Sequence, residues 1–340
     1  MAALCCWTAV SSFSAPAVPC GAFVARATKT VPSLAVEQTL ILFDPEQELE
    51  HFIRQIAIRD PSPGFGFVVP VPEKPIVTKV KEQPFARLAE RFPVQSGLGL
   101  GGIRGGGRGG GMAAAAAPVV VLSRSKVGSF TAFVLAASDA KALQKWFSDN
   151  QLVVPPEAEA WLGHYVKLGF YFAALRYEVP EKPADKGATR AETIRISFKS
   201  PLPFYPYREP VHPRPSDVER ELAVWLISTR AYTPISLFEP GPTPAGGAAQ
   251  WQRPLDQRSS RQVARGVLAG TLSDELLQLL PPSAVGAAHP LTVQVFEDQK
   301  RSRAGFGDIV MVPQQQTALS SLFLERSHKL MASLDPAVAP

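Results

Sequence analysis

The stretch at 127–174 reads VGSFTAFVLAASDAKALQKWFSDNQLVVPPEAEAWLGHYVKLGFYFAA and decides the fold class. It begins with GSFTAFVLA at 128–136, a short apolar run that predicts a strand paired with a second apolar run at 119–122. It ends in FYFAALRYEV at 170–179, which predicts another strand. Predicted strands therefore frame this stretch at both ends.

Two helices are predicted between these strands. Ser138 is a suitable N-cap for the first helix, which has one apolar face and ends near Asn150. Pro155 and Pro156 begin the second helix, because proline is preorganised for the first helical position. Gly169 follows the end of that helix. The whole stretch is thus predicted to run strand, helix, helix, strand.

The N-terminal third adds three short apolar runs and one helix. Residues 39–43, 52–58 and 65–71 are bounded by proline, glycine or aspartate and predict strands. Pro70 cannot donate a ladder hydrogen bond, so we expect it at a sheet edge or a strand end. Apolar residues at helical spacing predict a short amphipathic helix at 85–92.

The second half of the chain continues with strands and a few helical patterns. Strands are predicted at 193–198, 222–228, 291–296 and 308–312, with a helix kept as the alternative for 222–228. Helical patterns lie at 260–268, 272–280 and 317–333. Strands outnumber helices without steady alternation, so the predicted class is α+β. We expect largely antiparallel sheets, a few short packed helices and long flexible loops.

Two stretches of unusual composition divide the chain. The Gly/Ala-rich stretch at 97–117 predicts a flexible insertion, because glycine at this density costs too much backbone entropy to order. The Pro/Gly-rich stretch at 236–258 predicts a linker or loop. These boundaries leave an α+β domain at 18–235 and a C-terminal α/β segment at 259–340, which we expect to pack on that domain.

Residues 1–17 predict an atypical signal peptide. An apolar stretch leads to Ala15 and Ala17, the small-residue spacing of a cleavage site, although no charged residue precedes Arg26. A first apolar strand or a frayed tail is the alternative. Cleavage after Ala17 would leave Cys20 as the single cysteine. The alternatives for this residue are a small buried hydrophobe, a free thiol, one half of an intermolecular disulfide or the site of an acyl anchor. The expected location is extracytoplasmic, either periplasmic or secreted.

Charge and composition argue against two classes of protein. A net charge of +5 over 340 residues is too mild to indicate a nucleic-acid-binding face. Arg104 and Arg108 lie in a glycine-rich stretch, but two cations without aromatic neighbours are too few for RNA binding. No uncharged apolar run approaches the about 20 residues that cross a bilayer. We therefore expect no nucleic-acid partner and no transmembrane segment.

No motif for catalysis or for ligand binding has a fitting context. The G-x-G-x-x-G spacing at 97–102 runs on into glycine and does not open a helix. Ser123 and Lys126 form an S-x-x-K pattern, but they join two predicted strands, where Lys cannot lie beneath Ser as it does on a helix. The five histidines lack metal-ligand spacing. We expect no cofactor and no metal, and the catalytic residues are unknown.

The block at 127–174 resembles a bacterial family, the domain of unknown function 2330, in its order of strand, Ser-Asp-Ala cap, Trp-bearing helix, proline-opened helix and Gly-aromatic strand. GFVVPVP at 66–72 resembles the family's Trp-Val-Val-Pro-Val-Pro strand, and 194–210 its Pro-Tyr-Pro-rich strand end. The resemblance covers about residues 18–230 and implies export and an α+β fold, but no activity. Family members have a second cysteine where this chain has Ala25, so the short disulfide loop that the resemblance implies cannot form here.

Two functional hypotheses remain. The first is a non-enzymatic binding protein or envelope-associated scaffold with an unknown envelope or secreted partner. In this hypothesis the aromatic residues at 170–172 and 204–207 line a binding groove, and the default alternative is that they pack in the core. The second is an extracytoplasmic hydrolase-like enzyme whose site is assembled from distant residues. His212, Asp217 and Glu219 are the candidate residues for such a site.

Overall fold

The computed structural model of the chain describes residues 22–24, 36–59, 66–80, 84–93, 118–152, 154, 158–178, 189–210, 220–237, 252–254, 260–268, 291–300, 303 and 307–314. Within these ranges the chain is mostly strand, with three short helices. The strands form three largely antiparallel sheets of five, seven and four strands. The α+β class predicted from the sequence is confirmed.

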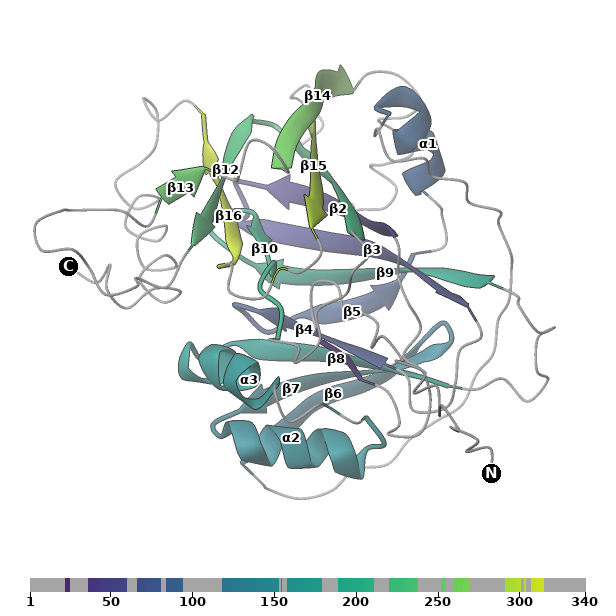
Figure 1. Ribbon diagram of the computed structural model, residues 1–340, viewed down its shortest axis with the longest axis vertical. Coiled ribbons are helices and arrows are strands. Elements are labelled where there is room, and N and C mark those ends of the chain that lie inside the picture. Colours follow the sequence, from purple (N-terminus) through teal and green to yellow (C-terminus); the bar gives the residue numbers. More distant parts are fainter. Residues whose placement is uncertain are drawn as a thin grey trace, which may run out of the picture.

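The five-stranded sheet forms one end of the molecule (Figure 1). All its neighbouring strands are antiparallel. Its strands, in spatial order, are β1 (Ala22–Val24), β4 (Gly66–Val71), β8 (Tyr171–Tyr177), β7 (Phe130–Ala137) and β6 (Val119–Val127). Pro70 lies one residue before the end of β4, pairs with Phe172 of β8 and lies beyond the three residues that pair with β1, so the predicted position at a strand end is confirmed.

The seven-stranded sheet lies above it in Figure 1 and contains one parallel pair, formed by β11 and β2. In spatial order its strands are β14 (Ser260–Leu268), β15 (Leu291–Lys300), β11 (Arg220–Ser228), β2 (Val36–Asp44), β3 (Leu49–Arg59), β9 (Thr189–Lys199) and β5 (Ile76–Lys79). Strands from both ends of the chain thus share one sheet.

The four-stranded sheet is antiparallel and packs beside the seven-stranded sheet (Figure 1). It consists of β10 (Phe204–Tyr205), β16 (Ile309–Pro313), β12 (Tyr232–Leu237) and β13 (Gln252–Pro254). The strand β10 is short because it belongs to a proline-rich segment. Proline lacks the backbone N–H that a longer ladder would need.

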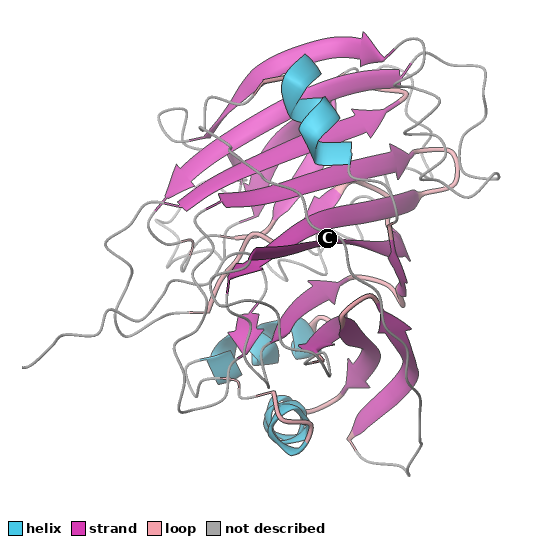
Figure 2. Ribbon diagram, turned by 90° about the vertical axis from the view of Figure 1, so that its right-hand side faces the viewer, coloured by secondary structure: helices cyan, strands magenta, loops and turns pink. Residues whose placement is uncertain are grey.

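Three helices cover the sheets. Figure 2 shows α1 (Pro84–Arg91) lying across the seven-stranded sheet, where Phe85 makes an edge-to-face contact with Trp225 at 5.9 Å between ring centroids. The helices α2 (Ala140–Asp149) and α3 (Ala158–Lys167) lie beside the five-stranded sheet. Trp146 of α2 packs edge-on against Phe133 of β7 at 5.1 Å.

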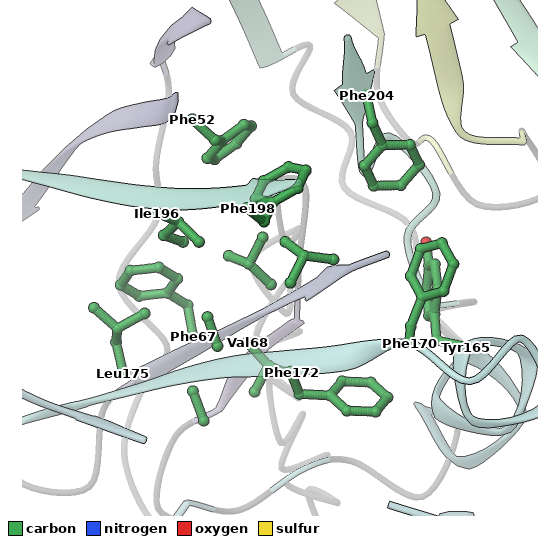
Figure 3. Close-up of a cluster of buried hydrophobic side chains, with 14 of the residues drawn as sticks. Phe52, Phe67, Val68, Tyr165, Phe170, Phe172, Leu175, Ile196, Phe198 and Phe204 are labelled. Atoms are coloured by element: carbon green, nitrogen blue, oxygen red, sulfur yellow. The ribbon is translucent and has the colours of Figure 1, made fainter. Parts of the chain in front are cut away.

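The main core lies between the five-stranded and seven-stranded sheets. Figure 3 shows Phe52, Ile196 and Phe198 of the larger sheet above Phe67 and Leu175 of the smaller one. These five side chains are at most 2% exposed. Burying a side chain of this size contributes about 1.5–3 kcal/mol to folding, so this apolar interface fixes the relative position of the two sheets.

The tight turn between β6 and β7 forms a polar contact between the same two sheets. Gly128 has a φ of +60°, whereas the φ of the next residue, Ser129, is not positive. This combination is typical of a type II′ hairpin turn. The backbone N–H of Ser129 donates to both carboxylate oxygens of Glu192 from β9, at 3.0 and 2.8 Å. Glu192 therefore anchors the turn to the neighbouring sheet.

Several predicted elements are confirmed and three are corrected. Residues 222–228 form a strand, as preferred over the helix. Residues 260–268, predicted as helix, form β14, because pairing with β15 outweighs a weak local preference. The N-cap of α2 is Asp139 and not Ser138, whose N–H is bonded to the carbonyl of Pro118. Ser123 and Lys126 lie within β6 and not in a connection between strands.

Other predictions fall outside the described residues. These are the signal peptide at 1–17, the insertion at 97–117, the prolines at 155 and 156, and the helical patterns at 272–280 and 317–333. Within the linker predicted at 236–258, residues 236–237 belong to β12 and residues 252–254 form β13. No helix in the described ranges is long and apolar enough to cross a membrane.

Candidate functional site

The most unusual feature of the interior is a buried proline-rich segment, Ser-Pro-Leu-Pro-Phe-Tyr-Pro-Tyr-Arg-Glu-Pro at 200–210, here called the proline strap. It follows β9, includes β10 and is buried apart from partial exposure at Pro201 and Arg208. A buried segment must satisfy its backbone N–H groups, and four prolines reduce the number of those groups. The strap can therefore cross the interior without a long ladder of its own.

Tyrosine and charged side chains join the strap to the seven-stranded sheet. Tyr205 donates through its hydroxyl to Glu37 Oε1 at 2.9 Å, and Arg54 Nη2 lies 3.3 Å from the same oxygen. Glu37 and Arg54 come from adjacent strands β2 and β3, and both are 2% exposed. A buried carboxylate is stable only when it is paired and hydrogen-bonded, and this one has both kinds of partner.

A second group of charges continues from Tyr207. The Tyr207 hydroxyl donates to Asp298 Oδ2 at 2.7 Å, and Arg303 Nε donates to the same oxygen at 3.0 Å. The backbone N–H of Arg303 donates to Glu209 Oε2 at 3.0 Å. Arg303 is fully buried, and its guanidinium carbon lies 5.4 Å from the centroid of the Tyr207 ring.

These two groups form one interior cluster, because the Tyr205 and Tyr207 rings lie 6.4 Å apart and both line the same cavity. We define the interior cluster as Glu37, Arg54, Tyr205, Tyr207, Glu209, Asp298 and Arg303. The cavity measures about 20 Å³ and is otherwise lined mainly by apolar residues of β11, β12, β15 and β16, such as Val224, Pro234, Phe296 and Met311. A cavity of this size has room for about one water molecule.

Two further carboxyl groups hold the ends of the strap. Glu50 Oε2 accepts from the backbone N–H of Phe204 at 2.7 Å, and burial raises the pKa of Glu50 well above its ordinary value. Asp308 Oδ1 accepts from the Tyr165 hydroxyl at 2.9 Å and from the Arg208 N–H at 3.0 Å, and burial raises the pKa of Asp308. A carboxyl with a raised pKa is a candidate general acid, but both groups bond to the strap backbone and are buried.

One serine and one histidine have the distance of a nucleophile and its base. His51 Nδ1 lies 2.7 Å from Ser197 Oγ, across the pair of β3 and β9. Burial and the nearby Arg195 lower the pKa of His51 to about 4, and its Nε2 atom has no hydrogen-bond partner among the described residues. A catalytic triad needs an acid on that second nitrogen to orient the ring. This pair therefore lacks the group that would orient it for catalysis.

Little of the sequence-based site prediction can be placed. His212, Asp217, Glu219, Cys20, Arg104 and Arg108 all lie outside the described residues. His164 lies on α3 with its ring 5.1 Å from that of Tyr165. Within the described ranges no group of three His, Cys, Asp or Glu side chains is arranged to hold a metal ion.

The aromatic residues singled out from the sequence are core residues, except for the partly exposed Tyr171. Phe170, Phe172 and Phe204 are at most 2% exposed, as are both tyrosines of the interior cluster. The charged members of that cluster were missed by the sequence analysis. Their signal was a charge within an apolar strand, such as Glu37 in VEQTLILF or Arg54 in FIRQIAI. Such a pattern marks the charge but does not identify its partner.

Comparisons with known proteins agree with the resemblance found from the sequence. No curated protein and no solved structure matches this chain. Residues 14–220 match the bacterial family described as "Uncharacterized protein conserved in bacteria (DUF2330)". The match covers more than half of the 340 residues, including β2 to β9 and the proline strap. The chain belongs to this DUF2330 family.

Proposed function

We propose that the chain is an extracytoplasmic binding protein or envelope-associated scaffold, and not an enzyme. The observation that carries this proposal is the state of the interior cluster. Its carboxylates bond to arginines, tyrosines and backbone N–H groups of the same chain, around a cavity with room for about one water molecule.

Catalysis would require a different arrangement. A general acid or base must lie within about 3 Å of the atom with which it exchanges a proton, so a substrate must reach it. The carboxyl groups of Glu37, Glu50 and Asp298 are at most 6% exposed and are already bonded within the chain. These groups serve to hold the proline strap in place.

The proposed location depends on the N-terminal sequence. The apolar stretch before Ala15 and Ala17 and the small residues at those positions support cleavage and export. A chain built largely of strands offers sheet faces and sheet edges to which a partner outside the cytoplasm can bind. The envelope or secreted partner would contact the outside of the sheets, because the described apolar side chains between the two larger sheets are buried against one another.

The test is to express the full-length chain in a bacterial host, fractionate the cells and determine the N-terminal residue of the recovered protein. We expect an N-terminus at Val18 or Cys20 in an extracytoplasmic fraction. An intact Met1 in the cytoplasm would overturn the proposed location.

The enzymatic alternative is tested on the same purified protein. A panel of ester, peptide and glycoside substrates is incubated with the wild type and with the triple variant His212→Ala, Asp217→Asn, Glu219→Gln. The proposal expects no turnover by either protein above the buffer rate. Turnover by the wild type that the triple variant loses would show a hydrolase instead.

A further inference from the structure

The strand β6 leaves one edge of the five-stranded sheet open. It spans nine residues and is the last strand in the sheet order, so no described strand pairs with its outer side. The side chains from Ser123 to Lys126 are all exposed, and Val120 and Val121 are 50% and 42% exposed. Long exposed edges are templates for another strand, and proteins usually shorten or cover them.

The hairpin register shows which backbone groups point outward. Val127 and Phe130 flank the two-residue turn and form its hydrogen-bonded closing pair. Hydrogen-bonded and non-bonded pairs alternate along an antiparallel ladder. Ser125 therefore bonds to β7, whereas Arg124 and Lys126 direct their N–H and C=O groups to the open edge. An added strand would bond to these two residues.

The side chains of Arg124 and Lys126 share one face of the sheet, because residues two apart in a strand point the same way. The guanidinium carbons of Arg124 and of Arg176 on β8 lie 5.4 and 5.6 Å from the centre of the Phe133 ring. Glu178 is the carboxylate beside them; it bonds to Arg176 at 2.9 Å, and Lys126 contributes to lowering its pKa. Arg124, Lys126 and Arg176 outnumber Glu178, so these four side chains together carry a net positive charge.

The charge also argues against a second copy of the chain as the partner. An antiparallel pair of two β6 strands centred on Ser125 would place Arg124 of one copy opposite Lys126 of the other. Like charges directly opposite each other destabilise a strand pair. The bulge between Val121 and Ser123 further interrupts a continuous self-pairing edge.

We propose that β6 binds an extended acidic segment of a partner protein, which adds to the five-stranded sheet as a sixth strand. Two carboxylates at alternate positions of the segment would face Arg124 and Lys126, and an apolar residue on the opposite face of the segment would cover Val120. This inference rests on the proposed binding role and names the surface and the chemistry of its partner.

The probe is a fluorescent nine-residue peptide of alternating valine and glutamate, titrated with the purified full-length chain and followed by anisotropy. A matched peptide with lysine in place of glutamate is the control. We expect binding of the acidic peptide that weakens with added salt, and at least tenfold weaker binding of the lysine peptide. Equal affinity for the two peptides would overturn the proposal.

Two variants separate charge from strand addition. Lys126→Gln removes a cation and keeps the outward N–H, and we expect binding about threefold weaker or more. Lys126→Pro also removes that N–H, which does not bond to β7, so we expect at least a further tenfold loss. Equal affinity of the two variants would show that no strand is added.

Amide exchange on the wild type gives a readout that does not depend on the folding of a variant. Peptide binding should slow the exchange of the Arg124 and Lys126 amides and leave the already bonded Ser125 amide unchanged. Binding without this protection would overturn strand addition, and concentration-dependent dimers in sedimentation would point to self-pairing. Because the assay uses purified protein, its failure is distinct from a failure of export.

Discussion

Two arginines contact aromatic rings at the same distance in opposite surroundings. The guanidinium carbon of Arg303 lies 5.4 Å from the Tyr207 ring centroid, and that of Arg124 lies 5.4 Å from the Phe133 ring centroid. Arg303 is fully buried among carboxylates, whereas Arg124 is exposed on the edge strand β6. The ring contact alone contributes about 0.5–1 kcal/mol at an exposed site. What separates the two residues is therefore the charge around them.

The difference indicates how this molecule divides its charged residues. In the interior cluster each charge is committed to holding the proline strap against the sheet. On the edge strand the cations are solvated and can change partners at little cost to folding. The charged residues of the interior cluster thus have a structural role, whereas the charged residues of β6 are exposed to solvent.

The largest expected effect comes from the same substitution at both arginines. Arg303→Met removes the cation that Asp298 and Glu209 both contact, and breaking a buried ion pair in this way costs about 3–5 kcal/mol of unfolding free energy. Arg124→Met should change it by less than about 0.5 kcal/mol, because its charge is solvated. Urea unfolding of both variants measures the difference. Equal losses would show that the interior cluster does not stabilise the fold.

A prediction from the sequence was most successful where the pattern was local. The strand predicted at 39–43 lies within β2, and those predicted at 128–136 and 308–312 overlap all but the ends of β7 and β16, because short apolar runs bounded by turn residues specify strands directly. The segment at 260–268 was mistaken for a helix because SRQVARGVL has no decisive propensity. Its state is set by β15, a strand more than 20 residues further along the chain.

The interior cluster was not predictable for a different reason. Glu37 and Asp298 lie far apart in the sequence and flank the same residue, Leu222, only because β11 lies between β2 and β15, with parallel pairing on one side. No spacing rule in one sequence encodes that order. The proline strap was visible in the sequence as Pro-Phe-Tyr-Pro-Tyr at 203–207, but the same composition suits an exposed turn.

The next effect concerns protonation inside the sheet. The pKa of His51 is lowered from 6.5 to about 4, so the unfolded chain binds the proton more tightly than the folded chain. This difference in pKa stabilises the folded chain fully above pH 6.5. As the pH falls towards 4, the unfolding free energy decreases by about 2–3 kcal/mol. His51→Gln should lose this part of the pH dependence, measured by urea unfolding between pH 7.5 and 4. The control variant Lys126→Gln should keep the wild-type dependence of the unfolding free energy on pH. If the wild type and both variants showed the same dependence, the assignment to His51 would be wrong.

Glycine substitutions test the contact between the turn that joins β6 to β7 and Glu192 of the seven-stranded sheet. A Cβ at Gly128 would lie 1.9 Å from Glu192 Oε2, whereas at Gly169 nothing lies within 4 Å, although both glycines have positive φ. Gly169→Ala should therefore cost only the backbone conformation, about 1 kcal/mol. Gly128→Ala should cost about 2 kcal/mol or more, because it also displaces the carboxylate that anchors Ser129. Equal costs in thermal unfolding would show that the anchor contributes nothing.

The smallest effect is expected on the edge itself. Val120→Thr places a hydroxyl on a residue that is 50% exposed, where water can bond to it, so the unfolding free energy should change by less than about 0.5 kcal/mol. Val69→Thr makes the same change in β4, where the side chain is fully buried, and should cost about 1–3 kcal/mol. If Val120→Thr were as costly as Val69→Thr, β6 would already be covered within the folded chain. The edge would then be unable to accept a partner strand, and the division between a committed interior and an exchangeable edge would fail.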